Sequence, residues 1–158
     1  MSKKKLGIIG GGQLGSMLSE AAKKLEIKTT VYCDDQDGPA QNFCDEFIFG
    51  SYKDNEKILE FANKVDVITY EFENIPFETL NEMNKLKLVL PKPSINRLIQ
   101  HRIAEKDFVN KLNIRTTRYV SVEKKSDIET LEDFLPGILK TTTMGYDGKG
   151  QYPIKKIE

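Results

Sequence analysis

Three groups of residues in this 158-residue chain have types and spacings that could support chemistry. The first is a glycine turn, Gly10-x-Gly12-x-x-Gly15, between a short apolar run and an amphipathic run. Glycine allows a sharp turn and lets a ligand approach main-chain N–H groups. Because a helix N-terminus also leaves N–H groups unpaired, the turn predicts a site for a phosphate or another anionic group.

The same glycine spacing fits the dinucleotide-binding fingerprint. Asp34 follows Gly15 at about the separation at which an acidic residue binds the ribose of NAD. The fingerprint is weak evidence by itself, since many phosphate-binding α/β domains share it, and a purely structural turn is a third interpretation. The rest of the chain has to decide among these interpretations.

The second group is a pair of carboxylates, Glu71 and Glu73, which lie just beyond the strand expected at 66–70. In open α/β sheets, ligands bind outside the carboxyl ends of the strands, which is also where the glycine turn lies. Residues two apart in an extended segment point the same way, so we expect both carboxylates to face this edge. The alternative is a solvated loop in which Asn74 caps the next helix and Pro76 occupies its first turn.

The third group is a glycine-rich turn that contains a lysine, residues 145–151, between strand-like segments at 136–140 and 152–156. No Gly-Lys-Ser/Thr sequence opens a helix here, so the turn is not a P-loop. It predicts a hairpin flap whose N–H groups and ammonium charge cover phosphates. An ordinary flexible hairpin is the alternative.

Alternating strands and helices must position these groups. Short segments rich in apolar and β-branched residues, at 6–9, 28–32, 46–49, 66–70 and 88–90, predict the strands of a parallel α/β sheet. The helix from Gln13 is expected to bury the side chains at its apolar positions, which are Leu14, Met17, Leu18, Ala21 and Leu25. Further along, we expect a helical region from Ser94 that breaks near His101, a strand at 116–122 and a helix capped by Ser126.

Composition and charge exclude several classes of function. Hydrophobic residues make up 39% of the chain, and the 24 basic residues balance the 24 acidic ones, which argues against a nucleic-acid partner. No apolar run approaches the ~20 residues that span a membrane, and the first residues lack the features of a signal peptide. Cys33 and Cys44 have no metal-ligand spacing, so we expect two reduced thiols in a cytoplasmic protein.

Taken together, the three groups resemble one family, the 5-(carboxyamino)imidazole ribonucleotide synthetases, which are ATP-grasp ligases of purine biosynthesis. The matching segments are IIGGGQLG at 8–15, TYEFEN at 69–74 and GYDGKGQ at 145–151, with further matches at 102–106 and 138–140. They occur in the family's order over nearly the whole chain. Met144 departs from the pattern, because the family usually has another glycine there.

The resemblance implies a fold and a division of the chain. The implied fold is a Rossmann-like parallel sheet, the pre-ATP-grasp domain, at 1–93. A connecting helical region at 94–114 leads to the incomplete first part of an ATP-grasp domain at 115–158. The chain would therefore be an N-terminal fragment of a homodimeric enzyme, without activity by itself. The magnesium ligands of ATP-grasp enzymes come later in the chain, so no metal site is expected in this fragment.

The resemblance also implies a reaction: ATP-dependent carboxylation of the exocyclic amine of 5-aminoimidazole ribonucleotide by bicarbonate, through carboxyphosphate and with Mg²⁺. The implied contacts to the ribonucleotide come from Gly11, Gly12, Gln13, Leu14, Glu71 and Glu73. The implied contacts to ATP come from Arg102, Lys140, Gly145, Tyr146, Asp147, Gly148, Lys149, Gly150 and Gln151. Tyr146 and Lys149 would lie nearest the reacting groups as catalytic residues.

Two interpretations from other classes remain open. The glycine spacing and Asp34 are compatible with a Rossmann domain of an NAD-dependent oxidoreductase. A truncated chain could equally act as a non-catalytic nucleotide-binding module. The position of Glu71, after the fourth expected strand, favours a compact ribonucleotide over a dinucleotide, which would use Asp34 instead.

Overall fold

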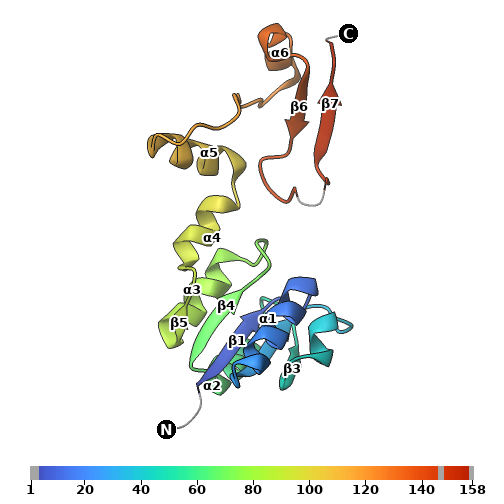
Figure 1. Ribbon diagram of the computed structural model, residues 1–158. Coiled ribbons are helices and arrows are strands. Elements are labelled where there is room, and N and C mark those ends of the chain that lie inside the picture. The colour runs from blue at the N-terminus through green and yellow to red at the C-terminus, as the bar shows by residue number, and fades with distance from the viewer. Residues whose placement is uncertain (1–3, 146–147, 157–158) are drawn as a thin grey trace. The chain divides into compact units, whose positions relative to one another are not determined.

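The computed structural model describes residues 4–145 and 148–156. The chain divides into two compact units, Met1–Arg97 (unit 1) and Leu98–Glu158 (unit 2). Figure 1 shows the order of helices and strands along both units. Each unit is described by itself below.

Unit 1 is built around a five-stranded parallel sheet with strand order β3-β2-β1-β4-β5. Its strands are β1 (Lys5–Ile9), β2 (Lys28–Cys33), β3 (Glu46–Phe49), β4 (Val67–Tyr70) and β5 (Leu88–Val89). The helices are α1 (Gln13–Lys24), the 3₁₀ turn η1 (Pro39–Asn42), α2 (Asn55–Lys64) and α3 (Phe77–Leu86). A further helix, α4 (Pro93–Ile99), begins in unit 1 and contains the first two residues of unit 2. The predicted α/β class and parallel sheet are therefore confirmed.

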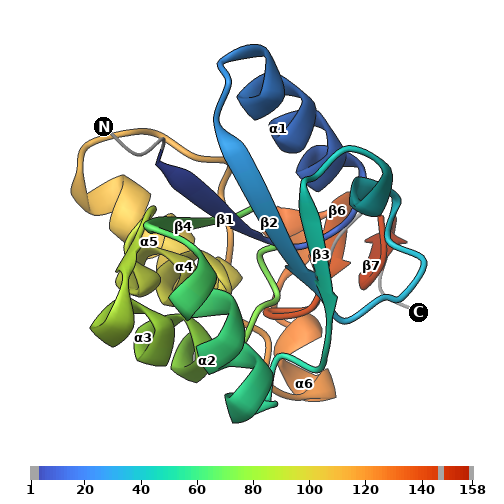
Figure 2. The same ribbon diagram turned by 90° about the horizontal axis from the view of Figure 1, so that it is seen from below.

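Helices cover both faces of this sheet, as parallel strands require. In Figure 2, α1 lies on one side of the strands, while α2 and α3 lie on the other. Successive side chains of a strand point to opposite faces of the sheet, so neighbouring residues pack into two different hydrophobic cores, one on each face. Ile8 and Val31 join Cys33 and Ala40 on the side of α1, whereas Ile9 and Tyr32 join the larger core with Phe61, Ile68 and Leu80.

The packing of α1 contradicts the sequence prediction. Its buried residues are the small ones, Gly15, Ser16, Ser19 and Ala22, and the apolar positions expected inside face outward, with Leu14 55% and Leu25 72% exposed. The helix lies so close to the chain beneath it that a Cβ on Gly15 would be 2.4 Å from the Gly10 carbonyl oxygen. Because α1 packs so closely against the sheet, only its small residues fit at this contact. The large side chains of α1 therefore face outward.

Unit 2 is smaller and less regular. It contains α5 (Arg102–Lys111), α6 (Lys125–Ile128), the 3₁₀ turn η2 (Glu132–Phe134), and the strands β6 (Gly137–Lys140) and β7 (Gln151–Ile154), which pair antiparallel. The predicted hairpin is thus present, and the helical region does break near His101, which caps α5 by accepting from the Ala104 N–H. Ser94 and Ser126 lie inside helices rather than at their caps.

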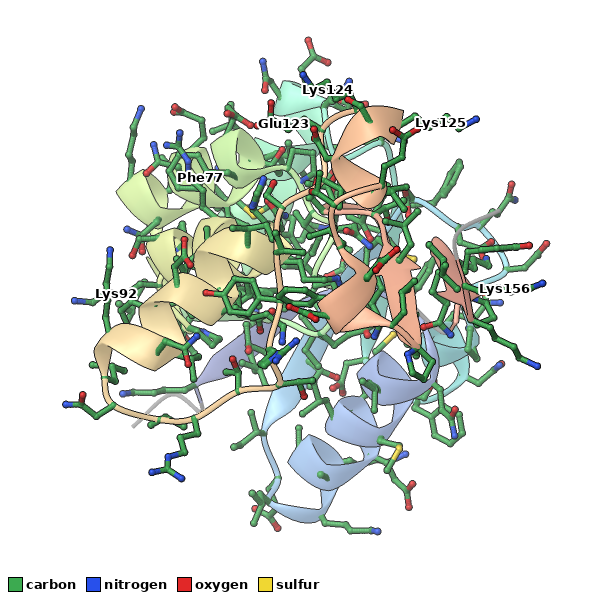
Figure 3. All side chains as sticks on the ribbon, turned by 90° about the horizontal axis from the view of Figure 1, so that it is seen from above. Phe77, Lys92, Glu123, Lys124, Lys125 and Lys156 are labelled. Atoms are coloured by element: carbon green, nitrogen blue, oxygen red, sulfur yellow. The ribbon has the colours of Figure 1, made fainter. Side chains whose placement is uncertain are left out.

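The strand predicted at 116–122 is absent, and this segment is irregular. A strand needs a hydrogen-bonded partner, which β-propensity alone does not supply, and β6 and β7 pair only with each other. Within the described part of unit 2, no side chain is buried. The charged side chains of Glu123, Lys124, Lys125 and Lys156 extend away from the ribbon of this unit (Figure 3).

Candidate functional site

The glycine turn of unit 1 connects β1 to α1, at the carboxyl edge of the sheet. Gly10 has φ +104°, in the left-handed region that favours glycine, and its N–H donates to the Tyr32 carbonyl at 2.9 Å. Gly11 is buried: its carbonyl accepts from the Ala40 N–H, and an added Cβ would be 2.8 Å from Cys33 Sγ. The exposed part of the turn is therefore Gln13 and Leu14, with Gly12 half-buried.

Glu71 reaches this turn from the end of β4. Its N–H donates to the Ile9 carbonyl at 3.0 Å, and its carboxylate Oε1 accepts from the Gly12 N–H at 3.2 Å. The side chain lies directly over Gly10, where an added Cβ would be 2.5 Å from Oε1. The sequence prediction that Glu71 and the glycine turn share one edge agrees with this geometry.

The half-buried position of Glu71 has an electrostatic consequence. Desolvation raises the pKa of this carboxyl above its usual value, and the hydrogen bond from Gly12 opposes the rise in part. A carboxylate held where ionisation is unfavourable is a common feature of functional sites, although ion-pair networks can produce it too. Here no cation is a cause of the pKa shift, and the hydrogen-bond partner of the Glu71 carboxylate is the Gly12 N–H group.

Glu73 lies in a turn beyond the end of β4. Glu73 and Asn74 form this turn, and the Glu73 side chain is exposed, whereas Glu71 is half-buried. The assumption of an extended chain through residue 73 is therefore wrong, and a common direction of the two carboxylates stays a prediction. The capping alternative is also wrong in detail, since Pro76 rather than Asn74 is the residue before α3.

Asp34, the discriminating acid of the dinucleotide interpretation, follows the last residue of β2 and is exposed. Both cysteines are free thiols, and burial raises the pKa of each. Within residues 4–145 and 148–156, no group of histidine, cysteine and carboxylate side chains could hold a metal ion. In the same residues, no helix is long and apolar enough to cross a bilayer.

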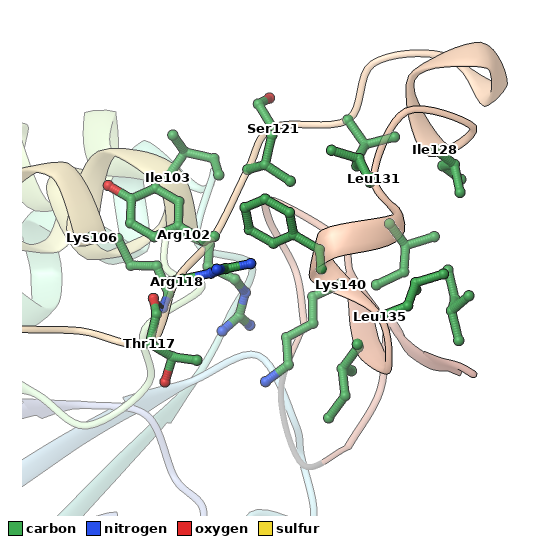
Figure 4. A pocket seen from close by; sticks show the side chains of 18 of the residues that line it. Arg102, Ile103, Lys106, Thr117, Arg118, Ser121, Ile128, Leu131, Leu135 and Lys140 are labelled. Carbon is green, nitrogen blue, oxygen red and sulfur yellow. Dashed lines mark hydrogen bonds between the residues drawn. The ribbon is translucent and has the colours of Figure 1, made fainter. Parts of the chain in front are cut away.

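In unit 2, a cavity of about 740 Å³ brings two of the predicted ATP-binding residues together. Arg102, at the start of α5, and Lys140, at the end of β6, both line it. Figure 4 shows Arg102, Lys106 and Arg118 toward one end of this cavity, and the apolar side chains of Ile128, Leu131 and Leu135 toward the other. A cationic end beside an apolar end suits a ligand with an anionic group and an apolar group.

Lys106 and Arg118 are cations of this cavity that the sequence analysis did not single out. The Arg118 guanidinium donates to the Asp133 carbonyl at 2.6 Å and stacks on Phe134, 4.6 Å from the ring centroid. Lys106 donates to the Thr117 carbonyl and lies 5.0 Å from the centre of the Tyr119 ring. Lys106 lies inside the matching segment 102–106 but was given no role there, and Arg118 lies in the segment 116–122, which was predicted to be a strand.

The predicted flap is only partly described. Tyr146 and Asp147 lie outside the described residues. Of the remainder, Gly148 and Gly150 have φ of +79° and +66°, Gly145 approaches Thr141, and Gln151 pairs with Lys140 across the hairpin. Met144 also adopts the left-handed conformation, with φ +58°. The glycine that the resemblance implies at this position would fit such a backbone, since a side chain there costs roughly 1–2 kcal/mol.

Comparison with protein families gives two matches along the chain. Residues 3–100 match the family described as "Ribonucleotide synthetase preATP-grasp domain", and residues 107–158 match the ATP-grasp domain.

Two proteins with established names are similar to this chain over most of its length. The chain is 37% identical to an N5-carboxyaminoimidazole ribonucleotide synthase of Staphylococcus haemolyticus, over 97% of this chain and 41% of the relative. A bifunctional purine synthesis protein purC/E of Dictyostelium discoideum is 41% identical over 92% of this chain and 15% of its own length. The chain thus spans well under half of these relatives.

Solved structures show the same likeness. An ADP complex of an N5-carboxyaminoimidazole ribonucleotide synthetase superposes with a TM-score of 0.90 at 35% identity, covering 99% of this chain and 42% of the other. An Aspergillus clavatus synthase in complex with ADP and 5-aminoimidazole ribonucleotide gives a TM-score of 0.82 at 28% identity, covering 98% of this chain and 41% of that one.

Proposed function

Because the chain belongs to the N5-carboxyaminoimidazole ribonucleotide synthetase family, we propose that it supplies part of the site for the ATP-dependent carboxylation of 5-aminoimidazole ribonucleotide. In this proposal, unit 1 binds the ribonucleotide at the glycine turn, and unit 2 binds ATP phosphates through Arg102 and Lys140. The proposed domains are 1–93, 94–114 and 115–158.

The observation that carries the proposal is the contact between Glu71 Oε1 and the Gly12 N–H. In a dinucleotide-binding domain, the N–H groups at this helix start are expected to receive the pyrophosphate. Here a carboxylate occupies one of them, and a phosphate beside it would be repelled. The ligand group next to Glu71 should therefore be a hydrogen-bond donor, such as a ribose hydroxyl or an amine, which favours the ribose and amine side of the ribonucleotide.

Phosphoryl transfer needs positioning and charge neutralisation more than a nucleophilic side chain. Arg102 and Lys140 would neutralise phosphate oxygens, and the glycines of the flap would offer N–H groups. Gly11, Gln13, Leu14 and Glu73 remain proposed ribonucleotide contacts. Gly145, Gly148, Lys149, Gly150 and Gln151 remain proposed ATP contacts, together with Tyr146 and Asp147, and Tyr146 and Lys149 remain the proposed catalytic pair.

Several finer parts of the proposal rest on the family resemblance. They are bicarbonate as the carboxyl donor, Mg²⁺ bound with ATP, and a homodimer. A cytoplasmic location is supported in addition by the two free thiols, which suit a reducing compartment. The described residues offer no carboxylate cluster for Mg²⁺, so this chain's own contribution to phosphate binding would come from its cations.

The test is calorimetric titration with 5-aminoimidazole ribonucleotide and with NADH, on the wild type, Glu71→Gln and Asp34→Ala. We expect ribonucleotide binding that weakens about tenfold in Glu71→Gln and is unchanged in Asp34→Ala, because a charged hydrogen bond is worth about 1.5–3 kcal/mol. Saturable NADH binding that Asp34→Ala abolishes, with no ribonucleotide binding, would instead support the oxidoreductase.

The ATP half of the proposal is tested by titration with ATP. Lys140→Ala should weaken ATP binding about tenfold to a hundredfold, since it removes a charge-assisted phosphate contact. Lys125→Ala is the matched control, because that exposed side chain extends outward from α6 (Figure 3). Equal affinities for both variants would remove Lys140 from the site.

A further inference from the structure

Arg102 makes three hydrogen bonds to carbonyl groups of the segment that follows β6. Its main-chain N–H donates to Thr142 at 2.8 Å, its Nε to Thr141 at 3.3 Å and its Nη2 to Gly145 at 3.3 Å. Arg102 is itself the first residue of α5. These bonds therefore join the start of a helix to the turn that leads into the flap, two segments far apart in the sequence.

The turn that receives these bonds is closely packed. We call Thr141, Thr142, Gly145 and Gly150 the flap base. The Thr141 N–H donates to the Gly150 carbonyl at 2.8 Å, which closes the turn. An added Cβ on Gly150 would be 2.4 Å from Thr141 Oγ1, and one on Gly145 would be 3.0 Å from the same oxygen and 3.4 Å from Arg102 Nη2. A side chain on Gly145 would therefore crowd Thr141 Oγ1, whereas its distance to the guanidinium would be an ordinary contact.

The guanidinium has more donors than the flap base uses. Its five N–H groups point in fixed directions in one plane, and Nε and one N–H of Nη2 reach the two carbonyls. Among the residues that the structure describes, the guanidinium makes only these two hydrogen bonds, so its other N–H groups can reach a second acceptor on the side of the cavity that Arg102 lines. A lysine would keep the positive charge, but a single ammonium cannot reproduce this planar pattern of donors.

We propose that Arg102 is a positioning residue that holds the flap base against the start of α5, in addition to its contact with the phosphates of ATP. This inference rests on the proposed function for the role of the flap and assigns Arg102 a second task there. The Arg102 guanidinium would thus fix the turn that presents the glycine N–H groups of the flap. Its remaining N–H groups would bind the phosphate that the flap covers.

The test is hydrogen–deuterium exchange of the 158-residue protein, read at the amides of the flap base. We expect exchange at the Thr141 amide to be about tenfold faster in both Arg102→Ala and Arg102→Lys, because each loses the paired contacts to Thr141 and Gly145. Arg118→Ala is the matched control: it removes an arginine of the same cavity that bonds to Asp133 instead, so the Thr141 amide should exchange as in the wild type. Wild-type exchange in Arg102→Lys would overturn the proposal.

A second variant guards against a general loss of structure in Arg102→Ala. Gly145→Ala keeps the arginine but places a methyl group 3.0 Å from Thr141 Oγ1, which crowds the flap base, and it should accelerate exchange of the same amide. Titration with ATP then separates this inference from the proposed function. Weaker ATP binding in Arg102→Ala with wild-type exchange would leave Arg102 a phosphate contact only and refute the positioning role. Fast exchange with wild-type ATP binding would support the positioning role and remove Arg102 from the ATP site.

Discussion

Unit 1 and unit 2 support their candidate residues in different ways. The Glu71–Gly12 contact of unit 1 stands on β1 and β4, whose residues Ile8, Ile9 and Ile68 are completely buried. The described residues of unit 2 include no buried side chain, and Arg102 and Lys140 are held by hydrogen bonds and a two-stranded hairpin. Packing thus fixes the geometry of the first group, whereas local polar contacts fix that of the second.

The comparison predicts a large difference in hydrogen exchange. Main-chain amides of β1 and β2 should exchange through global opening of unit 1, and amides of β6 and β7 through small local openings. With an ordinary unfolding free energy of about 5 kcal/mol or more for unit 1, the protection factors should differ by about 10³ to 10⁴. Exchange in the absence of ligand, followed by mass spectrometry, checks this. Similar protection of both sheets would mean that unit 2 is stabilised as strongly as unit 1.

A pair of truncations sharpens the same comparison. Phe61 is completely buried in the larger core of unit 1, so Phe61→Ala should lower the free energy of unfolding by about 3–5 kcal/mol. Ile138 in β6 of unit 2 is 60% exposed, so Ile138→Ala should change the free energy of unfolding of its unit by less than about 0.5 kcal/mol. Urea unfolding followed by far-ultraviolet circular dichroism measures both. A loss of several kcal/mol in Ile138→Ala would show packing that its exposure does not suggest.

The smallest expected effect concerns the charge on Glu71. Because burial raises the pKa of this carboxyl, its protonation favours the folded state, and that contribution is present below the unfolded pKa and lost as the pH rises through the folded pKa. Glu71→Gln lacks the charge, so at pH 7 it should be more stable than the wild type, by about 1 kcal/mol or less.

The gain should disappear as the pH falls below about 4.3, where glutamate is protonated even in the unfolded chain. Urea unfolding at several pH values measures the difference, with Glu73→Gln as the control on an exposed carboxylate of the same loop. If Glu71→Gln proved less stable than the wild type at pH 7, the carboxylate would be stabilising the folded state there, contrary to this prediction.

The sequence predicted the features that depend on local signals. Gly10, Gly12 and Gly15 marked the turn, β-branched runs marked the strands, and the position of Glu71 after a strand placed it beside the turn, because the carboxyl ends of parallel strands meet at one edge. Features that depend on distant partners were not predictable. The outward apolar face of α1 was missed as well, although its cause is local: α1 packs closely at Gly15 against Gly10, and a hydrophobic pattern does not encode such a close approach.

The candidate site in unit 2 shows the same limit. Arg102 and Lys140 were named from a resemblance, and their common cavity could not be inferred from residues so far apart in the chain. Arg118 was missed because the segment 116–122 has the composition of a strand, while the structure makes it an irregular lining segment of that cavity. Its contacts with Asp133 and Phe134 are tertiary, and no spacing in the sequence reveals them.

The strand order of unit 1 also bears on how the protein is made. β1 lies at the centre of the sheet and pairs with β2 on one side and with β4 on the other. Leu6 pairs with Val67, so this side of β1 stays unpaired until the ribosome has synthesised β4. At ~5–20 residues per second, a ribosome needs several seconds to synthesise that interval. During this time the apolar edge of β1 is available for pairing with other chains. β1, the central strand of the native sheet, is therefore the strand that lacks one of its partners longest during synthesis, which makes it a natural place for a chaperone to bind.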